Sequence, residues 1–126
     1  MKNIAVLGLG KVGTLVATLL SERFEVVGFD KEPPHYDHAH PFKVQALDVA
    51  DASALEKALG GFDAVVSALP YFLNKPVAKL AHDRGIHYFD LTEDVPTTAY
   101  IRELAKTAQS AMVPQCGLAP GFIGIM

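Results

Sequence analysis

The sequence predicts an α/β fold, in which a parallel sheet is covered by helices on both faces. Short apolar runs alternate along the chain with segments whose apolar residues recur at helical spacing. The chain has 126 residues, which is the usual size of one domain with one core. Half of its residues are hydrophobic and 20% are charged, a balance typical of globular proteins rather than disordered ones.

The apolar runs are predicted strands, because each is short, continuous and bounded by turn residues. They cover residues 3–8, 25–30, 42–49, 63–69, 86–91 and 111–116. Strands that alternate with helices form parallel sheets, and right-handed crossovers leave few topologies. Two halves of three strands predict the order 3-2-1-4-5-6, which is the doubly wound Rossmann arrangement.

Helices are predicted between these strands from the spacing of apolar residues and from capping signals. Ser53 and Glu56 have capping-box spacing at the start of the second helix. Asn74 is a predicted N-cap of the third helix. The four predicted helices lie at residues 11–22, 53–59, 74–84 and about 100–108.

The loop after the first strand, GLGKVG, predicts a phosphate-binding site. Gly8 permits the tight turn out of the strand, and Gly10 lets backbone N–H groups approach a pyrophosphate. Gly13 lets the helix pack closely on the strand. Lys11 and Val12 lie at the start of the helix, whose free N–H groups and dipole favour an anion. These residues are therefore predicted to bind a dinucleotide cofactor.

Asp30 ends the second strand, at the spacing expected of the acid that binds the adenosine ribose. Its carboxylate accepts hydrogen bonds from ribose hydroxyls and repels a 2′-phosphate, so NAD is favoured over NADP. Lys31 beside it offsets that charge and leaves NADP open; we include it among the predicted cofactor contacts. The alternative for Asp30 is a solvated carboxylate with no ligand.

The ends of the third and fourth strands supply further predicted cofactor contacts. Asp48 is predicted to accept from the adenine amino group, and Val49 to pack on the ring. An alternative for Asp48 is a capping acid before Asp51. The residues after the fourth strand are small or apolar and are predicted to line the path to the nicotinamide, unless they serve only core packing. They are Ser67, Ala68, Leu69 and Pro70.

Composition argues against several other classes of protein. The net charge is −3 without a basic run, which excludes a nucleic-acid or anionic-membrane surface. No apolar stretch approaches the roughly 20 residues that span a bilayer, and the N-terminus has no signal-peptide pattern. Cys116 is the single cysteine and forms no internal disulfide, so a cytoplasmic setting is predicted.

Three histidines, His35, His38 and His40, lie near Asp37 between the second and third strands. Such residues can bind zinc. Flanking prolines favour a solvated surface loop instead, so no metal site is predicted.

Several segments together resemble the N-terminal domain of the saccharopine dehydrogenase family. These segments are GLGKVG, GFD, SALPYFLNKPVAKLA, HYFDLTED and GLAPGF. The resemblance implies an NAD- or NADP-binding domain and hydride transfer between a nicotinamide ring and an amino-acid carbon–nitrogen bond. It also implies that residues 1–116 form the cofactor domain and that residues 117–126 begin the crossing to an absent second domain, which binds substrate and forms a homodimer.

The resemblance also assigns residues around the substrate. It implies that Tyr71, Thr92 and Glu93 face the substrate cleft, and that Cys116 and Gly117 border the nicotinamide. No general base is assigned. We expect the isolated chain to bind a dinucleotide without turning over an amino acid.

Two alternatives share the glycine loop and the strand-end acid. One is a ligand-sensing regulatory domain of the kind that gates potassium transport, and it catalyses nothing. The other is the cofactor domain of a different amino-acid dehydrogenase. The ALPY segment and the Pro-Gly turn near residue 120 favour the saccharopine dehydrogenase-like hypothesis.

Overall fold

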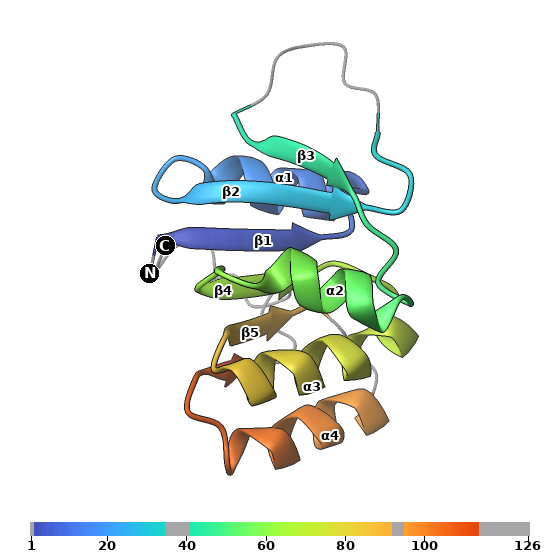
Figure 1. Ribbon diagram of the computed structural model, residues 1–126, viewed down its shortest axis with the longest axis vertical. Coiled ribbons are helices and arrows are strands. Elements are labelled where there is room, and N and C mark those ends of the chain that lie inside the picture. The colour runs from blue at the N-terminus through green and yellow to red at the C-terminus, as the bar shows by residue number, and fades with distance from the viewer. Residues whose placement is uncertain (1, 35–40, 92–94, 114–126) are drawn as a thin grey trace.

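A computed structural model describes residues 2–34, 41–91 and 95–113 of the chain (Figure 1). The strands are β1 (Asn3–Leu7), β2 (Glu25–Asp30), β3 (Lys43–Ala46), β4 (Ala64–Ser67), β5 (His87–Asp90) and β6 (Met112–Val113). They form one six-stranded sheet in the order β3-β2-β1-β4-β5-β6, and every neighbouring pair is parallel. The predicted topology is thereby confirmed. The switch point of the sheet lies between β1 and β4, where ligands bind in open α/β folds.

Helices cover both faces of the sheet (Figure 1). The helices of the described residues are α1 (Lys11–Leu20), α2 (Ala52–Leu59), the short 3₁₀ helix η1 (Tyr71–Leu73), α3 (Asn74–Arg84) and α4 (Val95–Ala105). The helix α1 packs on one face, and α2, α3 and α4 pack on the other. A doubly wound fold requires this division, because right-handed crossovers in opposite directions along the sheet place their helices on opposite faces.

Alternating side chains of the central strand β1 belong to two separate hydrophobic cores. Ile4 and Val6 of β1 pack against α1, while Ala5 and Leu7 pack on the side of α2, α3 and α4. All four are at most 1% exposed. Burying one side chain of valine, leucine or isoleucine stabilises a fold by about 1.5–3 kcal/mol. This two-sided burial holds β1, and the loop that follows it, at the centre of the molecule.

The starts of three helices differ from the prediction. The helix α4 covers Val95–Ala105 rather than residues of about 100–108. The N-cap of α2 is Asp51 rather than Ser53, because the Asp51 side chain accepts a hydrogen bond from Ala54 N at 3.2 Å. The N-cap of α3 is Leu73, which makes no side-chain capping bond. Asn74 lies inside the helix, where its side chain bonds elsewhere.

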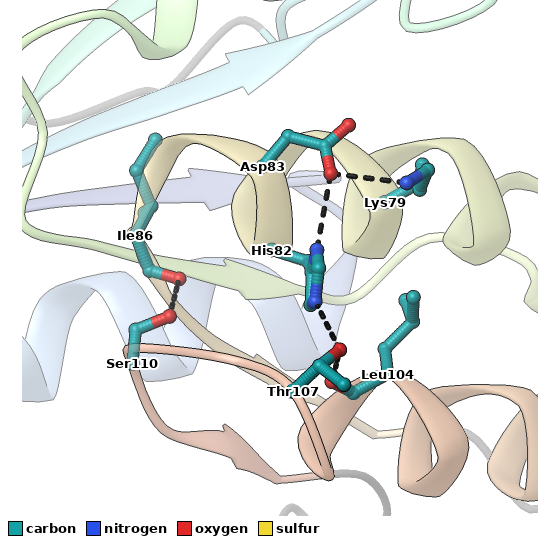
Figure 2. A network of polar contacts seen from close by, with 7 residues as sticks. All are labelled: Lys79, His82, Asp83, Ile86, Leu104, Thr107 and Ser110. Carbon is teal, nitrogen blue, oxygen red and sulfur yellow. Dashed lines mark hydrogen bonds and ion pairs between the residues drawn. The ribbon is translucent and has the colours of Figure 1, made fainter.

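A network of polar contacts joins the C-terminal ends of α3 and α4 (Figure 2). His82 lies between Asp83 and Thr107, with Nδ1 3.0 Å from Asp83 Oδ1 and Nε2 2.8 Å from Thr107 Oγ1. Lys79 Nζ donates to the same Asp83 oxygen at 3.0 Å. The bond from His82 and then that from Lys79 lower the pKa of Asp83. Because Asp83 and Lys79 are exposed, we assign this network a small structural role.

Asp63 fastens the N-terminus to the start of β4 and makes stability depend on pH. Its carboxylate accepts from Lys2 N at 2.7 Å and Asn3 N at 3.0 Å. The bonds from Asn3 and then Lys2 lower the pKa of Asp63 below its ordinary value of 3.8. A lowered folded-state pKa stabilises the fold above the unfolded-state pKa, and this stability is lost as pH falls through the folded-state pKa.

We therefore expect Asp63→Asn to reduce the acid sensitivity of folding. Between about pH 5 and about pH 3, the melting temperature of the variant should fall less than that of the wild type. Thermal melts followed by circular dichroism across this range measure the difference. Parallel declines in the two proteins would show that these two bonds contribute nothing to acid stability.

Candidate functional site

The glycine loop begins at the carboxyl end of β1, beside the switch point. Gly8 has a φ of 90°, a conformation that favours glycine. A Cβ added to Gly8 would lie 2.9 Å from the carbonyl oxygen of Ala68, which follows β4. The Gly8 N–H donates to Phe29 O in β2 at 2.8 Å. The loop therefore turns tightly between β2 and β4, and no side chain fits at its first glycine.

Close packing of α1 on the loop depends on Gly13. A Cβ at this position would overlap the carbonyl oxygen of Gly8 and would lie 3.3 Å from the Cβ of Ala68. The first turn of α1 thus lies directly on the loop, as the motif predicts.

The start of α1 is open in front of Gly10. Gly10 is exposed, and a Cβ built on it would meet no atom within 4 Å. The first turn closes with the bond from Thr14 N to Gly10 O at 2.9 Å, and no side chain caps the helix. The N–H groups of Lys11 and Val12 precede that bond and have no helical carbonyl to pair with. An uncapped helix start with free space before it fits a pyrophosphate.

Asp30 is bonded directly to the glycine loop. Its Oδ2 accepts from Leu9 N at 2.7 Å, and its Oδ1 accepts from Glu32 N at 3.1 Å. An ionised carboxylate has about four acceptor positions, so two backbone bonds leave capacity for ribose hydroxyls. Lys31 beside it is exposed. The predicted selector of the cofactor therefore also holds the loop in place.

Gly28, inside β2, is a site residue that the sequence analysis missed. A Cβ there would lie 2.7 Å from Leu9 Cδ2 and 3.1 Å from Phe42 Cε2. Gly28 thus makes room for Leu9, which is 4% exposed and lies between the first two glycines of the motif. The available signal was a glycine within a strand, which often marks a close approach of another group.

The predicted adenine contacts lie at the end of β3. Asp48 is exposed and accepts a hydrogen bond from Ala50 N at 3.0 Å, within a turn. Val49 is 8% exposed and packs into the core on the side of α2. The structure brings both residues to the carboxyl edge of the sheet, and their contact with adenine stays a prediction.

The segment after β4 faces the glycine loop across the switch point. Ser67 pairs in register with Leu7, and Ala68 N donates to Leu7 O at 2.8 Å. Ser67 is fully buried, Ala68 and Leu69 are partly buried, and Pro70 is exposed. The structure therefore brings this segment beside the loop, and its role in lining a path from the pyrophosphate to the nicotinamide stays a prediction.

Several predicted residues fall outside what the structure describes. Thr92, Glu93, Cys116 and Gly117 lie outside the described residues, as do the three histidines of residues 35–40. Tyr71 belongs to η1. In the part of the chain that is described, no group of three His, Cys, Asp or Glu residues could hold a metal ion. The helices of that part are all too short or too polar to cross a membrane.

A cavity of about 610 Å³ lies elsewhere, between α2 and α3. Its lining includes Gly61, which precedes β4, Ile86, which precedes β5, and the ion pair of Arg84 with Glu56. It therefore opens at the amino ends of the strands. Because ligands of open α/β sheets bind at the carboxyl ends, we place the functional site at the glycine loop instead.

Comparison with known proteins decides between the alternatives left open by the sequence. Residues 4–115 match the family model described as the saccharopine dehydrogenase NADP binding domain. The chain belongs to this family. The resemblance inferred from the sequence is thereby confirmed, and the cofactor is a nicotinamide dinucleotide, as the glycine loop predicted.

This chain spans less than a third of the length of the two saccharopine dehydrogenases described next. A Schizosaccharomyces pombe saccharopine dehydrogenase (NADP⁺, L-glutamate-forming) is 37% identical over 80 residues, covering 64% of this chain and 18% of that protein. Apo saccharopine dehydrogenase (L-glutamate-forming) from Saccharomyces cerevisiae has a TM-score of 0.71 at 26% identity. That match covers 96% of this chain and 28% of the yeast chain.

Two other dehydrogenases share the fold alone. A partial-consensus L-threonine 3-dehydrogenase has a TM-score of 0.72 at 16% identity, covering 90% of this chain and 52% of that one. Shikimate 5-dehydrogenase from Listeria monocytogenes has a TM-score of 0.63 at 17% identity, covering 93% of this chain and 46% of that one. These likenesses extend the Rossmann fold beyond the family and carry no substrate information.

Proposed function

We propose that this chain is the cofactor domain of an oxidoreductase that acts on an amino-acid carbon–nitrogen bond and prefers NAD to NADP. The observation that carries the proposed preference for NAD is the position of Asp30. Its carboxylate is bonded to the glycine loop through Leu9 N at 2.7 Å, so a negative charge is held beside the start of α1. That place is where the adenosine ribose lies in Rossmann folds.

The preference for NAD follows from charge. The 2′-phosphate of NADP carries about 1.5–2 negative charges near neutral pH. Asp30 would repel it, whereas the free 2′-hydroxyl of NAD donates a hydrogen bond to the same carboxylate. The family model is described as an NADP binding domain. We propose that this chain is a member of the family in which the strand-end acid Asp30 favours NAD over NADP.

The substrate class is inferred from the family. The longer relatives are named for saccharopine, which motivates an amine-to-imine oxidation or its reverse. A bound nicotinamide ring supplies the hydride transfer, and the chain's own residues bind and orient the ring. We propose that residues 1–116 do this, and that residues 117–126 lead towards a second domain that binds substrate and forms the dimer. Tyr71, Thr92 and Glu93 are proposed to face the substrate cleft.

We expect the isolated chain to bind NADH but to show no reduction of NAD that depends on lysine or saccharopine. The reason is that groups for the substrate's amine and carboxylate are proposed to lie on the second domain. Absorbance of NADH at high enzyme concentration measures turnover. Amino-acid-dependent NADH formation by this chain would overturn the assignment of the substrate groups to a second domain.

A further inference from the structure

Buried polar side chains of the described chain gather at one place in the fold. They occupy the last residues of β4 and β5 and the first turns of α3 and α4. They are Ser67, Asn74, Asp90, Thr97 and Thr98. Ser67 and Asp90 are opposite each other in the register of β4 and β5. The cluster thus lies just beneath the carboxyl edge of the sheet, where ligands of this fold bind.

Within this cluster, a short hydrogen bond joins Ser67 to Asn74. Ser67 Oγ donates to Asn74 Oδ1 at 2.5 Å, and both residues are 0% exposed. Leu69 N donates to the same Ser67 oxygen at 3.4 Å. A hydroxyl group can accept one hydrogen bond and donate another, so Ser67 Oγ accepts from Leu69 N while its proton is donated to Asn74 Oδ1.

The other half of the Asn74 amide has no partner. Asn74 Nδ2 is buried and makes no hydrogen bond in the described part of the chain. An unpaired buried N–H group destabilises a fold, and an apolar residue of similar size would avoid that cost. The bond from Ser67 to Oδ1 therefore accounts for an asparagine at this position. Asn74 does not serve as a cap, because the N-cap of α3 is Leu73 and no side chain caps this helix.

The link from Ser67 to Asn74 spans the loop of residues 68–73. The near side of this loop is held independently, because Ala68 N donates to Leu7 O in the sheet at 2.8 Å. Ala68 also contacts the glycine loop at Gly8. Beyond Ala68 the chain leaves the sheet. Leu69 and Leu73 pack against the core but stay partly exposed, and Asn74 is the next fully buried residue. Together with that packing, the link restrains the part of the loop that is farther from the glycine loop.

We propose that Asn74 is a positioning residue for the nicotinamide half of the cofactor. By holding Ser67, it fixes residues 69–73 beside the cleft on the side away from the adenosine. This inference rests on the proposed function, because it requires a nicotinamide dinucleotide bound across the switch point. It predicts that the adenosine and nicotinamide halves of the site can be perturbed separately.

The test compares NADH with ADP-ribose, which lacks the nicotinamide, on the chain with Asn74→Ala. We expect NADH to bind about tenfold more weakly to the variant, while the affinity for ADP-ribose stays within about twofold. The ratio of the two dissociation constants therefore moves towards one. Calorimetric titrations measure both constants, and thermal melts confirm that the variant is folded.

Val77→Ala is the matched control, because Val77 lies one turn later on α3, is 0% exposed and makes no bond to Ser67. It should lower the melting temperature without changing the affinity ratio. If Asn74→Ala does not fold, Ser67→Ala removes the same bond from the other side and should move the ratio of the two dissociation constants towards one in the same way.

The role of Asn74 would be overturned if the variant keeps the wild-type ratio of dissociation constants, including the case in which both affinities fall by the same factor. It would also be overturned if the wild type binds NADH and ADP-ribose equally well. Failure of the wild type to bind either ligand would instead overturn the proposed function, and with it this inference.

Discussion

Gly13→Ala is expected to abolish dinucleotide binding and to lower the free energy of unfolding by about 3 kcal/mol or more. The added methyl group would overlap the carbonyl oxygen of Gly8, which is backbone and cannot rotate away. Relief requires α1 to move off the loop, and that movement loosens the packing of Val16 and Ala17 on the sheet. Urea unfolding measures the loss of stability, and calorimetry measures the loss of binding.

Gly10→Ala adds the same methyl group with a different expected result. No atom lies within 4 Å of the added Cβ, and the φ of −71° suits any residue, so the fold should keep its stability. The methyl group would occupy the space before the helix start, and NADH affinity should fall about tenfold or more. Gly60→Ala is the control, since its Cβ would make only ordinary contacts 3.6 Å from Glu56 O, and it should change neither quantity. Unchanged NADH binding by Gly10→Ala would show that the pyrophosphate lies elsewhere.

Asp30→Asn is expected to raise the affinity for NADPH relative to NADH by about tenfold or more. Asparagine keeps an oxygen that can accept from Leu9 N and removes the negative charge that opposes a 2′-phosphate. The substitution therefore separates the electrostatic role of Asp30 from its support of the loop. Titrations with both reduced cofactors measure the ratio of affinities.

Glu32→Gln is the matched control for Asp30→Asn. It removes the same charge two residues away, from an exposed side chain. Its ratio of affinities should stay near that of the wild type. An equal shift in both variants would indicate a general effect of net charge, and no shift in Asp30→Asn would remove Asp30 as the selector.

The arrangement of strands and the loop chemistry were predictable because both depend on local patterns. Apolar runs mark buried strands wherever they pair, and β2 begins and ends at the predicted residues 25 and 30. The third helix was predicted over residues 74–84, and α3 ends at Arg84, followed by Gly85 with a φ of 69°. The third strand was predicted too long, because Leu47 and Val49 are buried in the turn after β3 rather than in the sheet.

Other features depend on partners far away in the sequence. The sequence pattern predicts Asn74 to be a helix cap, but its side-chain oxygen accepts from Ser67 because α3 starts next to the end of β4. The packing of Leu9 against Gly28 likewise depends on the register of β1 and β2. At α2, two capping candidates compete within three residues, and the sequence pattern favoured Ser53 although Asp51 makes the bond. Spacing along the chain does not contain these tertiary contacts.

The most direct test of the cofactor site is a calorimetric titration of the chain with NADH and, separately, with NADPH. The glycine loop and Asp30 predict saturable binding of NADH and at least about tenfold weaker binding of NADPH. Tighter binding of NADPH would contradict the role of Asp30 while leaving the family assignment intact. Absence of binding by both would show that this loop and helix start do not suffice to hold a nicotinamide dinucleotide.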